Sequence, residues 1–401
     1  MKILVTGSNG FIGKNLVATL RNIKDGKDKS YNFKVHDVML LHHNCSASEM
    51  LEYCAEADYV IHLAGVCRSE NKNDFATGNV GFLENLLQSL HKVGNLCPII
   101  FTSSIHVALE GKYAGSEYGE TKLKAEELLS RYSSQTGSKV YIYRLPNVFG
   151  KWSKPNYSSV VATFCHNVAN DLPIWVSNRE EKLNLAYIDD VVRDILTVLE
   201  EEKLCLKYQI DNFSRVRFCQ ITKSYYVSLG QLSDLVKYFG SNLKSLELPG
   251  LCDRSFEEKL RSTFLSYLPS EKVSFPLNSF QDERGSFTEI FKTKTCGQFS
   301  VNICKPNQTK GQHWHHSKWE FFVVVSGHGL IEQRRINSSE SNQSPSILKF
   351  DVCGEKPCVV RILPGYTHKI VNLSETEDLI TLMWANETFD PQKPDTYREN
   401  V

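Results

Sequence analysis

The sequence lacks features that would place it in several common classes of protein. It has no excess of charge, because 46 Lys and Arg residues balance 46 Asp and Glu residues. A protein that binds nucleic acid usually has a basic surface, so this balance argues against DNA and RNA as partners. No apolar run is long enough to cross a bilayer, and we therefore expect no membrane anchor.

A secretion signal and paired cysteines are also missing. The first apolar run, Met1–Val5, is interrupted by Thr6 and Gly7 and has no small-residue cleavage site. The 12 cysteines are scattered without a CxxC pair. In a chain of 401 residues this pattern predicts reduced thiols in a cytoplasmic protein, without disulfides or a zinc ribbon.

What is present falls into two regions that differ in hydrophobic pattern. In the first region, short apolar runs alternate with amphipathic helical segments, which predicts a parallel sheet covered by helices on both faces. The expected strands are 2–6, 59–64, 99–103 and 140–144, and the expected helices begin at Phe11 or span 80–91 and 118–132. A helical stretch over 243–268 follows, and a Pro-containing break over 269–276 ends it.

Beyond the break the pattern changes to short alternating runs with Gly and Pro between them, which predicts an all-β barrel or jelly roll. We therefore expect an α/β domain over 1–270 and an all-β domain over 271–401. The expected β runs are 298–304, 320–326, 359–363 and 379–384, with an exposed hairpin loop over 337–346.

The first motif is a glycine-rich loop between the first strand and the first helix. Gly7 would permit a tight turn, Gly10 would let backbone amides approach a pyrophosphate, and Gly13 would let the helix lie close to the strand. This spacing alone is a weak signal, but its strand–loop–helix context is typical of dinucleotide binding.

The second motif pairs Tyr118 with Lys122. Residues four apart lie on one helical face, so both side chains can point into one pocket. There the ammonium is expected to lower the pKa of the phenol, which would make Tyr118 a usable general acid. Such a pair is more often a solvated surface pair, and the glycine loop is what favours the catalytic interpretation.

These motifs resemble those of the extended short-chain dehydrogenase/reductase family, which implies a Rossmann-type, doubly wound parallel sheet. The resemblance implies that Tyr118 donates a proton to a ketone, that Ser104 hydrogen-bonds the same oxygen, and that Lys122 binds the nicotinamide ribose. Arg144, Asn147 and Tyr157 are expected sugar-nucleotide contacts, although Arg144 could instead pair with a structural carboxylate. The expected cofactor-binding residues are Gly7, Asn9, Gly10, Phe11, Ile12, Gly13, Leu63, Ala64, Tyr118 and Lys122.

The choice of nicotinamide cofactor depends on the second strand. An acidic residue at its end would bind the ribose diol of NADH, and Asp37 is a candidate. His36, His42 and His43 are equally able to lie near a 2′-phosphate. The wider family resemblance described below implies NADPH, with NADH as the alternative.

A third motif resembles the two cupin signatures. His313, His315 and Glu320 match the first signature, and His368 in Pro-Gly-Tyr-Thr-His matches the second. His313 and His315 would project from one face of a strand, whereas His316 should point away. A lone histidine is more often structural, but this set suits a divalent metal, with zinc expected and iron, manganese or nickel as alternatives.

The stretch Asp282–Glu289 resembles the entry strand of cupins that epimerise deoxy-keto-sugar nucleotides. In those cupins, a histidine in the place of His313 removes a proton beside the ketone, typically without a metal. The roles of base and of metal ligand therefore compete for His313.

A reductase fused to a sugar cupin resembles the bacterial bifunctional enzymes that make UDP-N-acetyl-L-fucosamine precursors for capsule and O-antigen. The resemblance implies 3-epimerisation of a UDP-linked 2-acetamido-2,6-dideoxy-4-keto sugar (a UDP-4-keto-6-deoxy-HexNAc) and then reduction of the 4-keto group. The implied product is UDP-2-acetamido-2,6-dideoxy-L-talose, and a homodimer is the expected assembly.

Three other hypotheses remain open. The cupin could serve only for dimerisation or sugar binding, or the whole chain could bind its cofactor as a sensor without turnover. The intact Ser104, Tyr118 and Lys122 set argues against the sensor. Dehydration or 4-epimerisation is the third, but those dehydratases usually carry carboxylates where this chain has Ile105 and His106.

Overall fold

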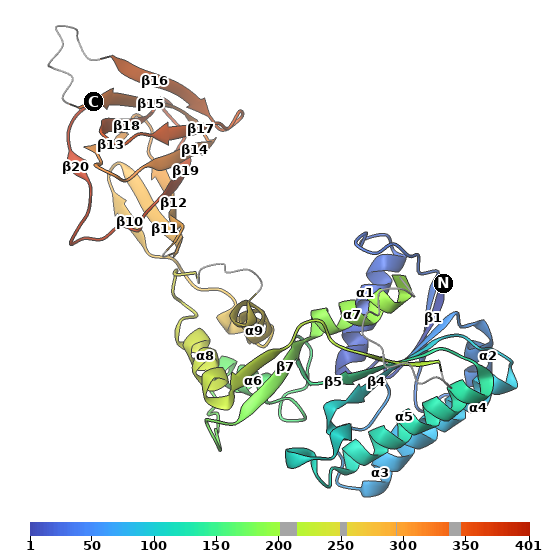
Figure 1. Ribbon diagram of the computed structural model, residues 1–401. Helices are drawn as coiled ribbons and strands as arrows, with labels where there is room; N and C mark the ends of the chain where they lie inside the picture. Colours follow the sequence, from blue (N-terminus) through green and yellow to red (C-terminus); the bar gives the residue numbers. More distant parts are fainter. Residues whose placement is uncertain (201–214, 249–254, 294, 337–345) are drawn as a thin grey trace. The chain divides into compact units, whose positions relative to one another are not determined.

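The computed structural model describes residues 1–200, 215–248, 255–293, 295–336 and 346–401 (Figure 1). The chain forms two compact units. The first unit contains Met1–Ser241 and Arg254–Pro269, and the second contains Asn242–Asp253 and Ser270–Val401. Each unit is described by itself.

The first unit is built on a six-stranded sheet in which every neighbouring pair is parallel. Because β2 and β3 lie on opposite sides of β1, the strand order reverses there, and such switch points are where open α/β sheets bind ligands. The strands, in sheet order, are β2 (Asp37–Leu41), β1 (Lys2–Thr6), β3 (Tyr59–His62), β4 (Ile99–Ser104), β5 (Val140–Leu145) and β8 (Val216–Cys219).

Helices cover both faces of this sheet, as expected for a doubly wound fold (Figure 1). Side chains alternate along each strand, so Ile3 and Val5 pack with one helix layer and Leu4 packs with the other. One layer contains α1 (Phe11–Lys24) and α7 (Ile188–Glu200), and the other contains α2 (Ala47–Glu56), α4 (Phe82–Lys92) and α5 (Glu117–Thr136). The short α3 (Lys72–Ala76) continues through a π-helical turn over Thr77–Gly81 into α4.

A smaller sheet and three helices complete the first unit. The ammonium of Lys259 on α9 lies 2.5 Å from the Asp190 carboxylate on α7, which fixes α9 against this unit. The elements are β6 (Asn147–Phe149), β7 (Lys182–Tyr187) and β9 (Tyr225–Ser228), with α6 (Val160–Ala169), α8 (Leu229–Ser241) and α9 (Phe256–Leu265).

The second unit is all-β and antiparallel, as predicted for the C-terminal part of the chain. Its core contains Phe322, Ile331 and Leu379, contributed by strands of both of its sheets. One sheet has β10 (Ser279–Asp282), β11 (Gly285–Thr293), β12 (Gly297–Cys304), β19 (Leu379–Ala385), β14 (Glu320–Ser326) and β17 (Val359–Ile362). The other has β16 (Ile347–Cys353), β15 (His328–Arg335), β18 (Tyr366–Asn372), β13 (Thr309–Trp314) and β20 (Tyr397–Arg398).

The helical prediction over 243–268 is wrong for its first part. Leu246 and Leu248 form backbone hydrogen bonds with Lys292 of β11, at 2.9 and 2.8 Å, and within the described part of this range the helix spans Phe256–Leu265. The apolar spacing of this segment favoured a helix, but its backbone pairs instead with β11, which is distant in the sequence. Residues 249–254, and 337–345 of the predicted hairpin loop, lie outside the described residues.

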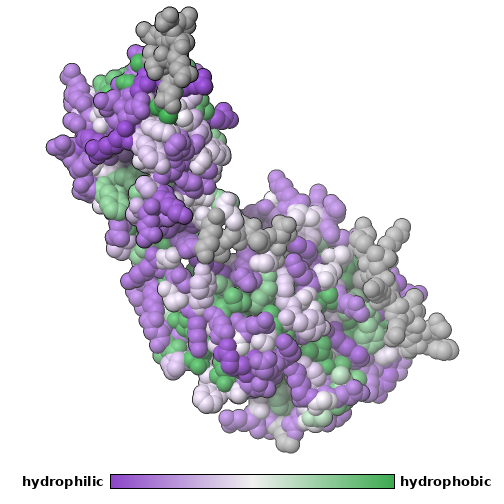
Figure 2. Space-filling model, turned by 60° about the vertical axis from the view of Figure 1, so that its left-hand side comes forward, coloured by the Kyte–Doolittle hydropathy of each residue, from purple (hydrophilic) through white to green (hydrophobic). Residues whose placement is uncertain are grey.

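The surface visible in Figure 2 is mostly hydrophilic, with apolar residues in separate small areas. Among the described residues, no helix is both long and apolar enough to span a membrane. The cysteines within the described ranges are all free thiols.

Candidate active sites

The glycine loop lies between the carboxyl ends of β1 and β3, where two backbone segments come very close. Gly7 has a φ of +70°, and a Cβ there would lie 2.6 Å from the Ala64 nitrogen. A Cβ on Gly13 would lie 2.1 Å from the Gly7 oxygen. Both positions therefore require glycine, which brings the start of α1 and residues 63–64 against one loop.

The start of α1 presents polar groups toward this loop. Gly10 is the N-cap and offers no side-chain cap, so the first amides of the helix are available to an anion. The buried Ser8 hydroxyl has no hydrogen-bond partner among the described residues. Asn9 lies beside His42, with 3.4 Å between Nδ2 and Nδ1. These features suit the phosphates of a dinucleotide.

Tyr118 and Lys122 both lie on α5, facing the end of β4. The Lys122 ammonium is buried, donates to the Thr102 carbonyl oxygen at 2.9 Å and lies 4.6 Å from the centroid of the Phe101 ring. Ser104 ends β4, and its hydroxyl is close enough to Tyr118 to influence the pKa of the phenol. The structure thus brings Ser104, Tyr118 and Lys122 together.

The expected lowering of the Tyr118 pKa is not what the structure favours. Burial raises the pKa of Tyr118 to about 12, and the nearby Ser104 hydroxyl offsets this only in part. Burial also lowers the pKa of Lys122 to about 8. In both residues the largest cause is desolvation, which penalises the charged form. Tyr118 is therefore firmly protonated at neutral pH, as a proton donor must be.

Two further residues lie beside this site. Asn79 is buried and holds the 65–67 loop, because its amide oxygen accepts from the Val66 nitrogen at 2.7 Å and its nitrogen donates to Thr121 at 2.9 Å. Cys67 is the last residue of this loop and is close enough to Tyr118 to influence its pKa electrostatically. No motif in the sequence analysis pointed to Cys67.

Arg144 pairs with a structural carboxylate, which was one of the two alternatives. Its guanidinium contacts both oxygens of Glu126, at 3.1 and 2.6 Å, and Glu126 also accepts from Ser103 at 2.5 Å. Glu126 is buried on α5, four residues after Lys122. Arg144 also borders a cavity of about 530 Å³ beside Ile105.

The remaining predicted sugar contacts lie at the same edge of the sheet. Asn147 is exposed at the start of β6. Tyr157 borders a cavity of about 450 Å³ together with Arg68 and the start of α6. The Tyr157 hydroxyl donates to the Arg68 carbonyl oxygen at 3.3 Å, and the Arg68 guanidinium donates to the Tyr157 carbonyl oxygen. Arg68 was not predicted from the sequence.

The second unit brings His313, His315, Glu320 and His368 into one cluster. Their ligand atoms all lie within 4.8 Å of one another. His313 of β13 lies opposite His368 of β18, beyond a bulge at Gln312, whereas His315 follows the end of β13. The Nε2 atoms of His315 and His368 each lie 3.5 Å from Oε2 of Glu320.

The charge states in this cluster suit a divalent cation. Burial lowers the pKa values of His313 and His368, the latter to about 3, so both imidazoles are neutral. Burial raises the pKa of Glu320, but the neighbouring imidazoles of His315, His368 and His313 outweigh it and lower the pKa. Among the described residues, Nε2 of His315, Oε2 of Glu320 and both nitrogens of His368 have no hydrogen-bond partner. Buried polar atoms without partners are what a metal centre leaves when its ion is absent.

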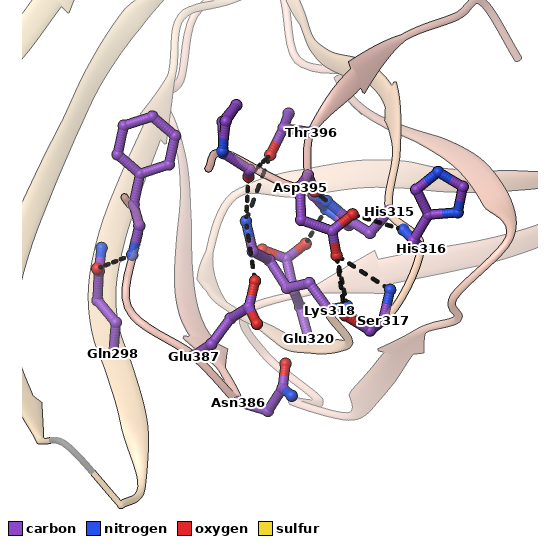
Figure 3. Close-up of polar contacts among 12 residues, drawn as sticks. Gln298, His315, His316, Ser317, Lys318, Glu320, Asn386, Glu387, Asp395 and Thr396 are labelled. Carbon is purple, nitrogen blue, oxygen red and sulfur yellow. Dashed lines mark hydrogen bonds and ion pairs between the residues drawn. The ribbon is translucent and has the colours of Figure 1, made fainter. Parts of the chain in front are cut away.

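His316 lies outside the cluster, as predicted. It is exposed and its ring packs against Trp314 and Tyr397, at centroid distances of 4.4 and 5.1 Å. A residue that the sequence did not reveal, Asp395, accepts hydrogen bonds from the loop that carries His315 (Figure 3).

Two family models match the chain, one for each unit. The NAD-dependent epimerase/dehydratase family matches residues 3–210, and the polysaccharide biosynthesis C-terminal domain matches residues 280–397. Together with the parallel sheet and its glycine loop, the first match defines the class of protein: an oxidoreductase of the short-chain dehydrogenase/reductase type with a nicotinamide cofactor.

Relatives match the chain over its whole length. A UDP-2-acetamido-2,6-beta-L-arabino-hexul-4-ose reductase from Pseudomonas aeruginosa is 37% identical over 403 residues, covering 100% of this chain and 99% of the relative. The capsular polysaccharide assembling protein CapF from Staphylococcus aureus has 42% identity and a TM-score of 0.84, with both chains fully covered. A structure of CapF with the inhibitor 3-isopropenyl-tropolone has 39% identity and a TM-score of 0.78. The chain belongs to the family of these proteins.

Proposed function

We propose that this chain is a bifunctional nucleotide-sugar enzyme. Its cupin would invert carbon 3 of a UDP-2-acetamido-2,6-dideoxy-4-hexulose, and its reductase would then reduce the 4-keto group to give UDP-2-acetamido-2,6-dideoxy-L-talose. The reductase would occupy residues 1–270 and the cupin residues 271–401. The observation that carries this proposal is that two sets of side chains converge in one chain, one around Tyr118 and one around His368. The relatives that match the chain over its full length include a UDP-keto-sugar reductase.

In the reduction, hydride would pass from the nicotinamide to carbon 4 while Tyr118 gives its proton to the ketone oxygen. The raised pKa of Tyr118 keeps that proton in place until negative charge develops on the oxygen. Ser104 would donate a second hydrogen bond to the same oxygen, and Lys122 would bind the ribose. Tyr157 and Arg68 border the cavity proposed for the sugar nucleotide, and the exposed Asn147 is a further proposed contact.

NADPH is the proposed cofactor. The ribose-binding position of this fold lies at the carboxyl end of β2. Asp37 is at the opposite end, paired with Lys2 in the sheet and bonded to Lys24 at 2.6 Å. His42 and His43 follow the carboxyl end of β2, and imidazoles can donate hydrogen bonds to a 2′-phosphate. The test is the ratio of kcat/KM for NADPH to that for NADH, which we expect to exceed one.

The cupin cluster is proposed to hold zinc. Neutral imidazoles and an ionised carboxylate fit this ion, and the unpartnered atoms of His315, Glu320 and His368 converge on one point. A divalent cation with an open coordination position supplies Lewis acidity to a substrate carbonyl. The protein itself would hold the sugar so that its carbon 3 faces His313, which is less buried than His315 and His368.

His313 is a candidate for two competing roles, catalytic base and metal ligand, because the single lone pair of a neutral imidazole cannot serve both at once. Its place in the cluster favours the ligand role. Its partial exposure and lowered pKa favour a neutral base within reach of substrate. His313→Ala distinguishes them: loss of proton exchange with retained zinc assigns the base, and loss of both assigns the ligand.

A homodimer in the cytoplasm is the proposed setting. An outward aromatic row runs across the first sheet of the all-β unit, with Phe299 paired opposite Trp384 and Trp384 opposite Phe321. A second copy of the same sheet could cover this row symmetrically. The free thiols fit a reducing compartment. Size-exclusion chromatography with light scattering tests the dimer.

The experiment that tests the proposal is incubation of the protein with a UDP-4-keto-6-deoxy-HexNAc, with and without NADPH, and identification of the products by NMR. We expect a reduced L-talo product with NADPH. A product that keeps its original configuration at carbon 3 would leave the cupin as a dimerisation or sugar-binding module, with chemistry confined to the reductase.

A further inference from the structure

Two segments far apart in the sequence interlock beside the His/Glu cluster (Figure 3). The first is the ligand loop, residues 315–318, which starts with His315 and leads to Glu320. The second is the strap, residues 394–396, which lies against the ligand loop and precedes β20. Between 76 and 80 positions separate the residues that contact each other.

The Asp395 carboxylate fixes the path of the ligand loop. One of its oxygens accepts from the backbone nitrogen of His316 at 2.8 Å, and the other accepts from the nitrogens of Ser317 and Lys318 at 3.0 and 2.9 Å. Successive backbone N–H groups that converge on one anion hold a tight and specific backbone conformation. The loop after His315 can therefore take this path only while the carboxylate is in place.

The Asp395 backbone acts on the ligand itself. Its carbonyl oxygen lies 2.5 Å from Nδ1 of the buried His315. A carbonyl oxygen only accepts hydrogen bonds, so Nδ1 must carry the proton. The lone pair is then on Nε2, the atom that lies 3.5 Å from the Glu320 carboxylate. Such contacts fix the tautomer and the ring orientation of metal-binding histidines.

Lys318 anchors the strap on both sides of Asp395. Its side chain is only 5% exposed, and its ammonium donates to the Pro394 carbonyl oxygen at 3.0 Å and to the Thr396 hydroxyl at 3.3 Å. Asp395 has a φ of +33°, a conformation that a residue with a side chain adopts at a cost. The anchors at Pro394 and Thr396 hold it there.

We propose that the strap is a positioning element of the metal centre, in which Asp395 shapes the ligand loop and selects the metal-binding tautomer of His315. This inference rests on the proposed metal centre and extends it to residues that contact neither ion nor substrate. It follows that the affinity for a divalent cation depends on the Asp395 carboxylate.

The test is Asp395→Asn in the full-length chain. The amide keeps the size of the side chain but turns an NH₂ group toward backbone N–H groups, which releases the loop. Asp390→Asn is the matched control, because the Asp390 carboxylate accepts from Gln392 instead. Zinc affinity is measured by competition with a chromophoric chelator, and Co²⁺ absorption reports the geometry of the centre.

We expect Asp395→Asn to weaken zinc binding about 10- to 100-fold and to change the Co²⁺ spectrum, while Asp390→Asn changes neither. NADPH-dependent reduction of an already epimerised ketone should be unaffected in both variants. If Asp395→Asn does not fold, Lys318→Met, which removes the anchors at Pro394 and Thr396, should weaken zinc binding at least tenfold.

Equal zinc affinity and an unchanged Co²⁺ spectrum in the folded Asp395→Asn protein would overturn this inference and leave the metal centre standing. If Asp395→Asn does not fold and Lys318→Met is used instead, an unchanged zinc affinity in Lys318→Met would overturn the inference as well. Failure of the wild-type protein to bind any divalent ion would overturn both the metal centre and the strap.

Discussion

The ammonium of Lys122 donates a hydrogen bond to the carbonyl oxygen of Thr102, 2.9 Å away, in a fully enclosed part of the first unit. This contact holds a buried cation beside the site proposed for the nicotinamide ribose. Burial has a cost, which appears as the lowered pKa of Lys122. The buried charge of Lys122 therefore lowers the stability of the cofactor-free protein at neutral pH.

We predict that Lys122→Met abolishes reduction and stabilises the cofactor-free protein at pH 7. Because the pKa of Lys122 is about 8 in the folded chain and near 10.5 otherwise, the unfolded state binds more protons between these values. Wild-type stability should thus rise by about 2–3 kcal/mol from pH 8 to 10, at ~1.4 kcal/mol per pKa unit. Above pH 10 the raised pKa of Tyr118 acts in the opposite direction.

Denaturant unfolding at several pH values checks this prediction. The rise between pH 8 and 10 should be lost in Lys122→Met and kept in Lys124→Met, which changes an exposed lysine on the same helix. A rise of equal size in Lys122→Met would mean that another group causes it.

Tyr118→Phe should lower NADPH oxidation by about 10²- to 10⁴-fold, because it removes the proton donor and keeps the ring. Deuterium exchange at carbon 3 should continue at the wild-type rate, since that step belongs to the other unit. Absorbance at 340 nm and NMR in heavy water measure the two activities. Tyr132→Phe, on the same helix, is the control and should leave both unchanged.

Glu320→Gln should lower the zinc content and abolish exchange at carbon 3, because it removes the charge of the carboxylate without changing its size. Reduction of an already epimerised ketone should persist. Glu332→Gln is the matched control, since Glu332 pairs with Lys349 and Lys369 in the same unit. Full zinc content in Glu320→Gln would remove Glu320 from the ligand set.

His42→Ala should lower kcat/KM for NADPH about tenfold and leave that for NADH unchanged, because a lost charged hydrogen bond costs roughly 1.4 kcal/mol. Asp37→Asn is the control, since Asp37 lies at the far end of β2 and should affect neither cofactor. Equal effects of His42→Ala on both cofactors would argue against a 2′-phosphate contact.

Much of the first unit could be predicted because its signals are local. The strand Lys2–Thr6 and the helix start at Phe11 were predicted to the residue, since an apolar run, a glycine loop and a helical period follow one another directly. The prediction failed at Leu246 and Leu248, where an apolar helical pattern yielded to pairing with Lys292.

The residues of the His/Glu cluster could be predicted from the sequence, but the residues that position them could not. His313 and His368 were named from motifs, and the structure brings them together across a strand pair. Asp395 acts mainly through backbone groups some 80 positions away, and no sequence pattern reports such a contact. The position of Asp37 at the amino-terminal end of β2 was not predicted, because hydrophobicity alone does not define where this strand begins.

The measurement that tests the central claim most directly is solvent exchange at carbon 3. The wild-type protein is incubated with the UDP-4-keto sugar in heavy water without NADPH, alongside His313→Ala, and deuterium beside the ketone is followed by NMR. The account predicts incorporation by the wild type at least 100-fold faster than by His313→Ala. The absence of incorporation by the wild type, with NADPH-dependent reduction intact, would contradict a catalytic role of the second unit.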